Sequence, residues 1–156
     1  MQKFNRRICR EIKSLLSAKT PGITLLLDPS QTTTETDLSL VKKLFVEILG
    51  ADDTLYAGEK FILLFDIPDT YPIEAPVVIF HGDNIPINEH VYSNGHICLS
   101  ILYDNWSPAM TIESVCLSII SFLSSAHRKI RPPGDQEYCR RAKDRSPKEF
   151  HWSYED

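Results

Sequence analysis

The sequence predicts one α+β domain in which an N-terminal helix and a central helix accompany a four-stranded antiparallel sheet. Three features support this: helical spacing of apolar residues near the N-terminus, four short apolar runs before residue 81, and a capped apolar stripe after residue 111. The chain has 156 residues, of which 42% are hydrophobic and 24% charged, as in an ordinary soluble domain. We expect residues 1–131 to form the core of the domain and residues 132–156 a tail of the same domain, either packed or flexible.

The first helix is expected over residues 3–17. Phe4, Ile8, Ile12 and Leu15 recur at helical spacing, and Pro21-Gly22 ends the pattern. Residues 1–19 contain six basic side chains against one acidic, whereas residues 20–125 contain three against fourteen. This basic helix on an acidic body indicates either docking onto an acidic partner protein or simply a solvated face.

The four expected strands are short runs rich in branched and aromatic residues, separated by polar turns. They are Ile23–Leu27, Leu44–Leu49, Phe61–Ile67 and Val77–Phe80. Together these runs predict the strands of an antiparallel meander. The prolines of Tyr71-Pro72-Ile73-Glu74-Ala75-Pro76 exclude a helix or central strand just before the fourth run.

A long segment without periodicity, residues 81–108, separates the sheet from the second helix. Loops of this length in a compact domain are usually functional. Thr111 can cap the helix that follows, and Ile112, Val115, Ile119 and Leu123 lie on one of its faces. After Arg131 the tail is polar, although residues 146–149 have a capping-box pattern that favours a short helix.

The charge and composition of the chain limit its expected partners and location. A net charge of −4 argues against nucleic acid as the partner of the whole domain. The longest charge-free stretch, residues 114–127, is too short and too rich in serine to span a membrane, and the charged N-terminus is no signal peptide. We therefore expect a protein of the cytoplasm or nucleus with four free thiols.

Cys98 is the strongest candidate for chemistry, because it sits in the irregular segment near polar and imidazole groups. Cys116 falls on an apolar helix stripe, and Cys9 and Cys139 have no motif around them. Two alternatives use the histidines. Zinc would have only three ligands in His90, His96 and Cys98, at an unfamiliar spacing. A Cys-His hydrolase with either histidine as base would need an orienting residue that the sequence does not single out.

Several motifs together resemble those of ubiquitin-conjugating enzymes, from about residue 3 to about residue 125. They are Gly50 with Leu55-Tyr56-Ala57-Gly58, Tyr71-Pro72 with Pro76, Tyr92-Ser93-Asn94-Gly95-His96-Ile97-Cys98-Leu99, and Trp106-Ser107-Pro108-Ala109. The resemblance implies that family's fold. It also implies that Cys98 accepts ubiquitin from an activating enzyme as a thioester and passes it to an amine with a RING-type ligase bound. No bound cofactor is implied, since the activating enzyme consumes the ATP.

The departures from the family pattern are informative. Asn88-Glu89-His90 replaces the usual His-Pro-Asn, so His90 takes the place of an asparagine thought to stabilise the loop or the oxyanion. We expect His90 either to donate a similar hydrogen bond or to brace the loop. Ser100 replaces a frequent acidic residue, and residues 127–131 replace an acidic loop.

With these departures, the sequence resembles the W-type branch of the family, whose members modify protein N-termini. Around neutral pH an α-amine has roughly several-hundredfold more neutral form than lysine, given pKa values near 7.8 and 10.4. It therefore needs less help from a carboxylate. We hypothesise that the missing acids suit substrates with accessible N-termini.

The resemblance also assigns expected partner surfaces and loop-shaping residues. Partner binding is expected at Lys3, Arg6, Arg7 and Arg10 on the first helix, and at Ile73, Ser107, Pro108 and Ala109 on two loops. Tyr92, Asn94, Gly95 and Trp106 are expected to shape the loop. Two other functions stay open: a catalytically silent ubiquitin-handling scaffold, and a conjugating enzyme for another ubiquitin-like modifier.

Overall fold

The computed structural model describes residues 5–27 and 34–154, apart from the side chains of Glu35 and Thr36. It confirms the predicted meander: strands β1 (Ile23–Leu26), β2 (Lys43–Leu49), β3 (Lys60–Asp66) and β4 (Val77–His81) pair antiparallel in chain order. The register places Val46 opposite Leu25 on one side and opposite Leu63 on the other. Each strand boundary lies within one residue of its expected position.

Helix α1 (Arg6–Ala18) begins three residues later than predicted. Its N-cap is Asn5, whose side chain accepts hydrogen bonds from the backbone N–H groups of Arg7 and Ile8. The cap gives the start a physical cause, since an asparagine carbonyl satisfies amide groups that have no partner inside the helix. Lys3 and Phe4 lie outside the described residues.

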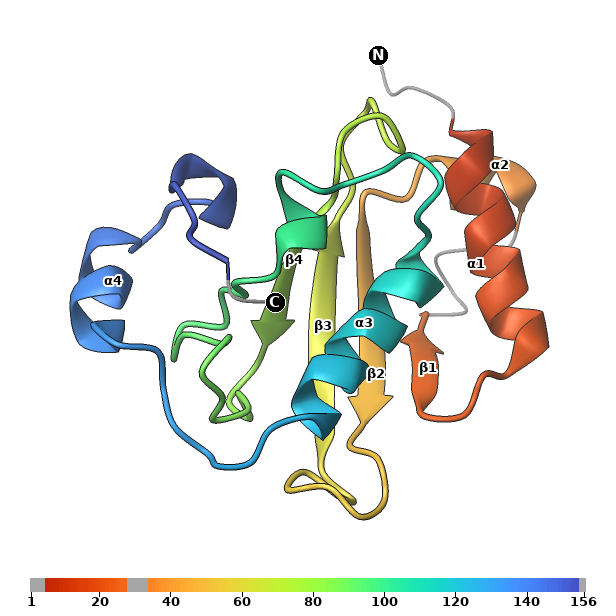
Figure 1. Cartoon of the computed structure of the whole chain (residues 1–156). Coiled ribbons are helices and arrows are strands. Elements are labelled where there is room, and N and C mark those ends of the chain that lie inside the picture. Colours follow the sequence, from red (N-terminus) through yellow and green to blue (C-terminus); the bar gives the residue numbers. More distant parts are fainter. Residues whose placement is uncertain (1–4, 28–33, 155–156) are drawn as a thin grey trace.

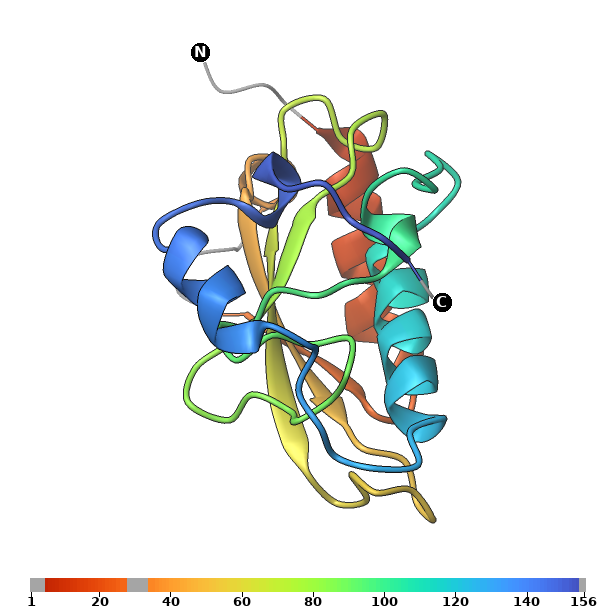
Figure 2. The same cartoon turned by 60° about the vertical axis from the view of Figure 1, so that its left-hand side comes forward.

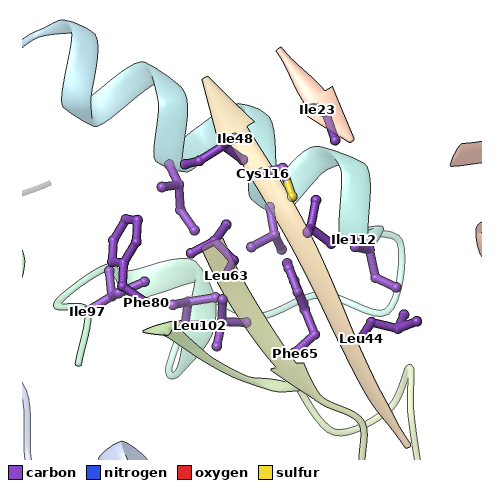
Figure 3. Packing of buried hydrophobic residues seen from close by; sticks show 14 of the residues in the cluster. Ile23, Leu44, Ile48, Leu63, Phe65, Phe80, Ile97, Leu102, Ile112 and Cys116 are labelled. Atoms are coloured by element: carbon purple, nitrogen blue, oxygen red, sulfur yellow. The ribbon is translucent and has the colours of Figure 1, made fainter. Parts of the chain in front are cut away.

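Helix α3 (Ile112–Ser124) has the predicted position and the predicted cap, in which Thr111 and Ser114 bond reciprocally. Its buried stripe packs on the inner sheet face, where Leu44, Ile48, Leu63 and Phe65 meet it (Figure 3). Cys116 belongs to this core, and burial raises the pKa of its thiol to about 12. It is therefore a packing residue.

Three short elements escaped prediction. Helix α2 (Glu35–Ser39) lies in a stretch that looked only polar, and its N-cap Thr34 accepts from Asp37 N–H. The 3₁₀ helix η1 (Ser100–Leu102) begins two residues after Cys98, and α4 (Asp135–Arg141) lies in the tail. The capping box at residues 146–149 forms as predicted, but around a 3₁₀ turn, η2 (Pro147–Glu149).

The tail packs against the domain beyond the β4 edge of the sheet, on the side away from α1 (Figures 1 and 2). It has a small core of its own, formed by Tyr138, Ala142 and Trp152, against which Tyr92, Cys98 and Tyr103 lie. Aromatic side chains therefore join the tail to the loop that precedes and follows Cys98. Among the described residues, no helix is long and apolar enough to cross a membrane.

Candidate active site

The segment before Cys98 is a tight turn fixed to the edge of the sheet. Gly95 C=O accepts from Phe80 N–H at 2.9 Å, and Tyr92 N–H donates to His96 C=O at 3.0 Å. Gly95 has φ of +92°, and a Cβ there would lie 2.2 Å from the carbonyl oxygen of Phe80. Only glycine fits this close approach to β4. The Asn94 side chain accepts from His96 N–H at 3.0 Å.

Cys98 itself is half-buried and lies between two backbone segments. Its N–H donates to the carbonyl of His90 at 2.8 Å, so the histidine expected to act in catalysis is a direct backbone neighbour of the cysteine. After Cys98 the chain turns into η1, and the Tyr103 hydroxyl donates back to Ile97 C=O at 2.7 Å. The thiol is thus placed at a sharp change of direction, held from both sides.

The His90 ring faces a shallow groove of about 570 Å³ along α3, lined by apolar side chains and serines that include Leu99, Leu117 and Ser121. The ring centroid lies 5.4 Å from that of Phe122. The ring therefore lines the α3 groove, whereas the Cys98 side chain packs against the tail cluster, and a backbone hydrogen bond joins the two residues.

Asn88 braces the loop, a role that the sequence analysis did not assign to it. Its buried side chain accepts from His90 N–H at 2.8 Å and donates to the Tyr56 hydroxyl at 3.1 Å. Arg131 adds to this support by donating to the carbonyls of Pro86, at 2.7 Å, and Val91, at 3.2 Å. Except for the local bond between His90 and Asn88, these contacts join residues more than thirty positions apart, so no local pattern could have revealed them.

His96 is a poor base for Cys98. Its side chain is buried, with Nδ1 2.7 Å from the Tyr138 hydroxyl, and burial lowers its pKa to about 4. The ring therefore stays neutral and is hydrogen-bonded to Tyr138 of α4. Within the described ranges, His90, His96 and Cys98 also do not gather into a set of three ligands for a metal ion.

The loops expected to bind partners lie together. Ile73 is 73% exposed, and Ser107, Pro108 and Ala109 are also exposed. The Trp106 indole N–H joins the two loops by donating to the Pro72 carbonyl at 2.8 Å. Arg6 and Arg10 are exposed on α1. Arg7 differs, because its guanidinium bonds Glu11 at 2.9 Å and Met110 C=O at 2.9 Å, and so holds α1 against the second loop.

The tail supplies residues that the sequence analysis missed. Tyr138 stacks on Tyr92 with ring centroids 3.9 Å apart, and Trp152 stacks on Tyr103 at 5.2 Å. The signal was available in the sequence: Tyr138, Phe150, Trp152 and Tyr154 are aromatic residues in an otherwise polar segment. Aromatic side chains of this number are unusual in a segment that stays in water.

Comparison with known proteins identifies the family. The family model described as ubiquitin-conjugating enzyme matches residues 7–155. The probable ubiquitin-conjugating enzyme E2 W-A of Danio rerio is 44% identical, covering 100% of this chain and 98% of its own length. The probable E2 W of Dictyostelium discoideum is 46% identical over 99% and 96%.

A solved structure agrees with these relatives. The ubiquitin conjugating enzyme E2 UbcA1 from Agrocybe aegerita superposes with a TM-score of 0.80 at 36% identity, covering 92% of this chain and 96% of that one. The fold, the motifs around Cys98 and the nearly full-length similarity agree, and the chain belongs to the W-type branch of the ubiquitin-conjugating enzymes.

Proposed function

We propose that Cys98 carries ubiquitin as a thioester and that the enzyme transfers it to the α-amino group of substrate N-termini. The observation that supports the first part is the placement of Cys98. Cys98 and Cys139 are both half-buried, but only Cys98 lies in the loop, where its N–H bonds the His90 carbonyl, whereas Cys139 lies in α4. Cys9 and Cys116 are buried. Members of this family work with ubiquitin, an activating enzyme and a ligase.

The chemistry at Cys98 is acyl transfer. Its thiolate sulfur attacks the carbonyl carbon of the ubiquitin C-terminus held on the activating enzyme, and that enzyme's thiol leaves. The neutral acceptor nitrogen later attacks the same carbon, Cys98 leaves as a thiolate, and the proton lost by the amine passes to solvent or a nearby base. ATP is spent on the activating enzyme, so we propose that this chain needs no cofactor of its own.

The choice of an α-amine is supported by what surrounds the acceptor side. Ser100 is buried, and the segment after α3 presents basic residues. Lys129 pairs with Glu59 at 3.0 Å, and Arg131 is used by the loop carbonyls. Residues 124–131 contain no carboxylate to take a proton from a lysine ammonium. An α-ammonium loses its proton more readily, so it depends less on such a group.

His90 is proposed to stabilise the oxyanion or to brace the loop beside it. Partner binding is proposed for the exposed residues of the first helix and of the two loops that Trp106 joins, with a RING-type ligase on the loops. Ile73 is the most exposed of the apolar residues there and would be the central anchor.

The test is a charging and discharge assay. The protein is incubated with ATP, activating enzyme and ubiquitin, then chased with free lysine or with a peptide whose only amine is its N-terminus. We expect a reductant-sensitive adduct that only the peptide discharges, absent in Cys98→Ser and retained in the matched variant Cys139→Ser. Discharge by lysine at an equal rate would contradict the α-amine choice. An absence of charging with any modifier would favour the silent scaffold, and charging by a different modifier alone would favour the third function.

A further inference from the structure

Residues 147–154, called here the C-terminal strap, lie across the cysteine. The Cys98 sulfur is 3.5 Å from the carbonyl oxygen of Ser153, which accepts its hydrogen bond. In Figure 2 this part of the chain runs from η2 past η1 toward α3. We infer that the face around Cys98 is a docking site for the chain's own C-terminal strap, and that the strap closes the thiol until it is displaced.

Aromatic stacking seats the strap. The Trp152 ring lies on Tyr103 with an interplanar angle of 21°, and the Tyr154 ring lies 6.2 Å from the same tyrosine at 19°. Phe150 packs on Tyr138 at 5.1 Å. Tyr103 follows η1 and Tyr138 lies in α4, so these rings hold the strap on both sides of Cys98. The strap is therefore built onto the site through several specific contacts.

A polar latch fixes the start of the strap. The Lys148 ammonium bonds the Glu74 carboxylate at 3.1 Å and also donates to the carbonyl of Ala75. The Trp152 indole N–H donates to Pro147 C=O at 2.9 Å, which folds the strap back on η2. The hydrogen bonds from Thr70 and Lys148 hold the pKa of Glu74 below its usual range, so the latch is charged at neutral pH.

The closed position conflicts with charging. For the thioester to form, the carbonyl carbon of the ubiquitin C-terminus must reach the Cys98 sulfur while the activating enzyme still holds it. The Ser153 carbonyl lies on one side of that sulfur, and the Cys98 side chain packs against the cluster that contains Trp152. Two folded proteins cannot approach past them, so the strap has to move first.

The few backbone hydrogen bonds of the strap allow it to move away from the rest of the domain. In residues 5–27 and 34–154, no ladder of backbone hydrogen bonds joins it to a strand, and the backbone N–H groups of Glu149 and Phe150 bond locally, to Ser146 and Pro147. A groove of about 430 Å³ also runs beside it, with Ile73, Asp104 and Trp106 on the opposite wall. Segments with few backbone bonds to the body open at low free-energy cost.

That the strap controls charging rests on the proposed function of Cys98. Whether the strap covers the thiol can be tested without ubiquitin. The full-length protein is treated with iodoacetamide, and alkylation of the Cys98 peptide is followed by mass spectrometry. The variants are a truncation after Ser146, the latch variant Lys148→Ala, and the control Lys143→Ala, which changes an exposed lysine of the same tail. Thermal unfolding shows that each variant is folded.

We expect Cys98 to be alkylated at least about threefold faster in the truncated protein and in Lys148→Ala than in the wild type or Lys143→Ala. The initial rate of ubiquitin charging is expected to rise in the same order. Equal alkylation rates in the wild type and Lys148→Ala would overturn the inference, whether or not the truncated protein folds. If the alkylation rates differed as expected but no ubiquitin thioester formed, the inference about the strap would stand and the proposed function would be refuted.

Discussion

The Nδ1 atom of His96 lies 2.7 Å from the hydroxyl oxygen of Tyr138, and both side chains are buried. His96 is two residues before Cys98, and Tyr138 is the buried residue of α4. This one contact therefore ties the turn that carries the cysteine to the tail that covers it. Burial lowers the pKa of His96 to about 4, so the contact involves a neutral imidazole.

The first prediction concerns the pH dependence of stability. The folded pKa of about 4 is below the unfolded value of 6.5, so between these values the unfolded chain binds more protons. The stabilisation is complete above pH 6.5 and is lost as the pH falls toward 4. From pH 7 to pH 5, His96 alone is expected to cost about 2 kcal/mol of unfolding free energy.

Urea unfolding at the two pH values measures this. The variant His96→Gln keeps a polar group toward Tyr138 but does not titrate, so its stability is expected to fall less between pH 7 and pH 5. The exposed His151→Gln serves as the control and should behave as the wild type. The same decrease in all three proteins would show that His96 is not the group responsible.

The sequence predicted those parts of the molecule whose signals are local. Helix α3 has a cap and an apolar stripe within fifteen residues, and the strands are bounded by turns, so both appeared where expected. Helices α2 and α4 have five and seven residues. Helices this short depend on packing against distant partners, and their own periodicity is too brief to be distinctive.

The residues of the site also divide into those with a local sequence signal and those that depend on distant partners. Cys98 and the Asn94-Gly95 turn are recognisable from their neighbours in the chain, whereas Asn88 and Arg131 act through Tyr56 and through loop carbonyls far away in the sequence. The charge and the prolines of the tail suit both a packed and an extended segment, so only its aromatic residues indicated that it packs. Its aromatic residues pack on tyrosines of the Cys98 loop that are far away in the sequence.

A second prediction separates backbone strain from steric overlap with a matched pair of glycines. Gly82 and Gly95 have φ of +91° and +92°, but a Cβ meets nothing within 4 Å at Gly82, whereas at Gly95 it would overlap the Phe80 carbonyl. Gly82→Ala is expected to cost about 1 kcal/mol from strain alone, and Gly95→Ala about 3 kcal/mol or more. Chemical denaturation compares the two. Equal losses would mean that β4 can move away from the turn.

A third prediction concerns Glu11, which is 7% exposed and joins three parts of the fold. Its carboxylate accepts from the Tyr71 hydroxyl at 2.6 Å and from Ile112 N–H at 2.7 Å, in addition to the Arg7 guanidinium. Replacing it by alanine leaves buried donors without an acceptor. Glu11→Ala is therefore expected to lower the unfolding free energy by about 3 kcal/mol.

The control for Glu11 is Arg10→Ala, which changes an exposed residue of the same helix and should cost no more than about 0.5 kcal/mol. Both are measured by urea unfolding at neutral pH. If Glu11→Ala were as stable as the control, the carboxylate would contribute no net stability, and packing of Ile8 and Ile12 alone would hold α1 in place.

The last prediction concerns Arg131, whose guanidinium donates to the carbonyls of Ile85, Pro86 and Val91. These carbonyls lie on both sides of residues 88–90, so one side chain closes the loop that carries His90. Without it, partly buried acceptors lose their donor, and Arg131→Ala is expected to cost about 2 kcal/mol. The loop should also open more often, because the bond from Val91 N–H to Asn88 C=O loses its support.

Hydrogen exchange over residues 85–98 is expected to quicken in Arg131→Ala, and discharge of ubiquitin to a peptide N-terminus to slow several-fold. The control Arg128→Ala, in the same segment but exposed, should change neither. Arg131→Lys is the discriminating variant: one ammonium cannot reproduce the planar fork that spans separate carbonyls, so it should restore only part of the protection. Full protection in Arg131→Lys would show that positive charge alone, and not the guanidinium geometry, holds the loop beside Cys98.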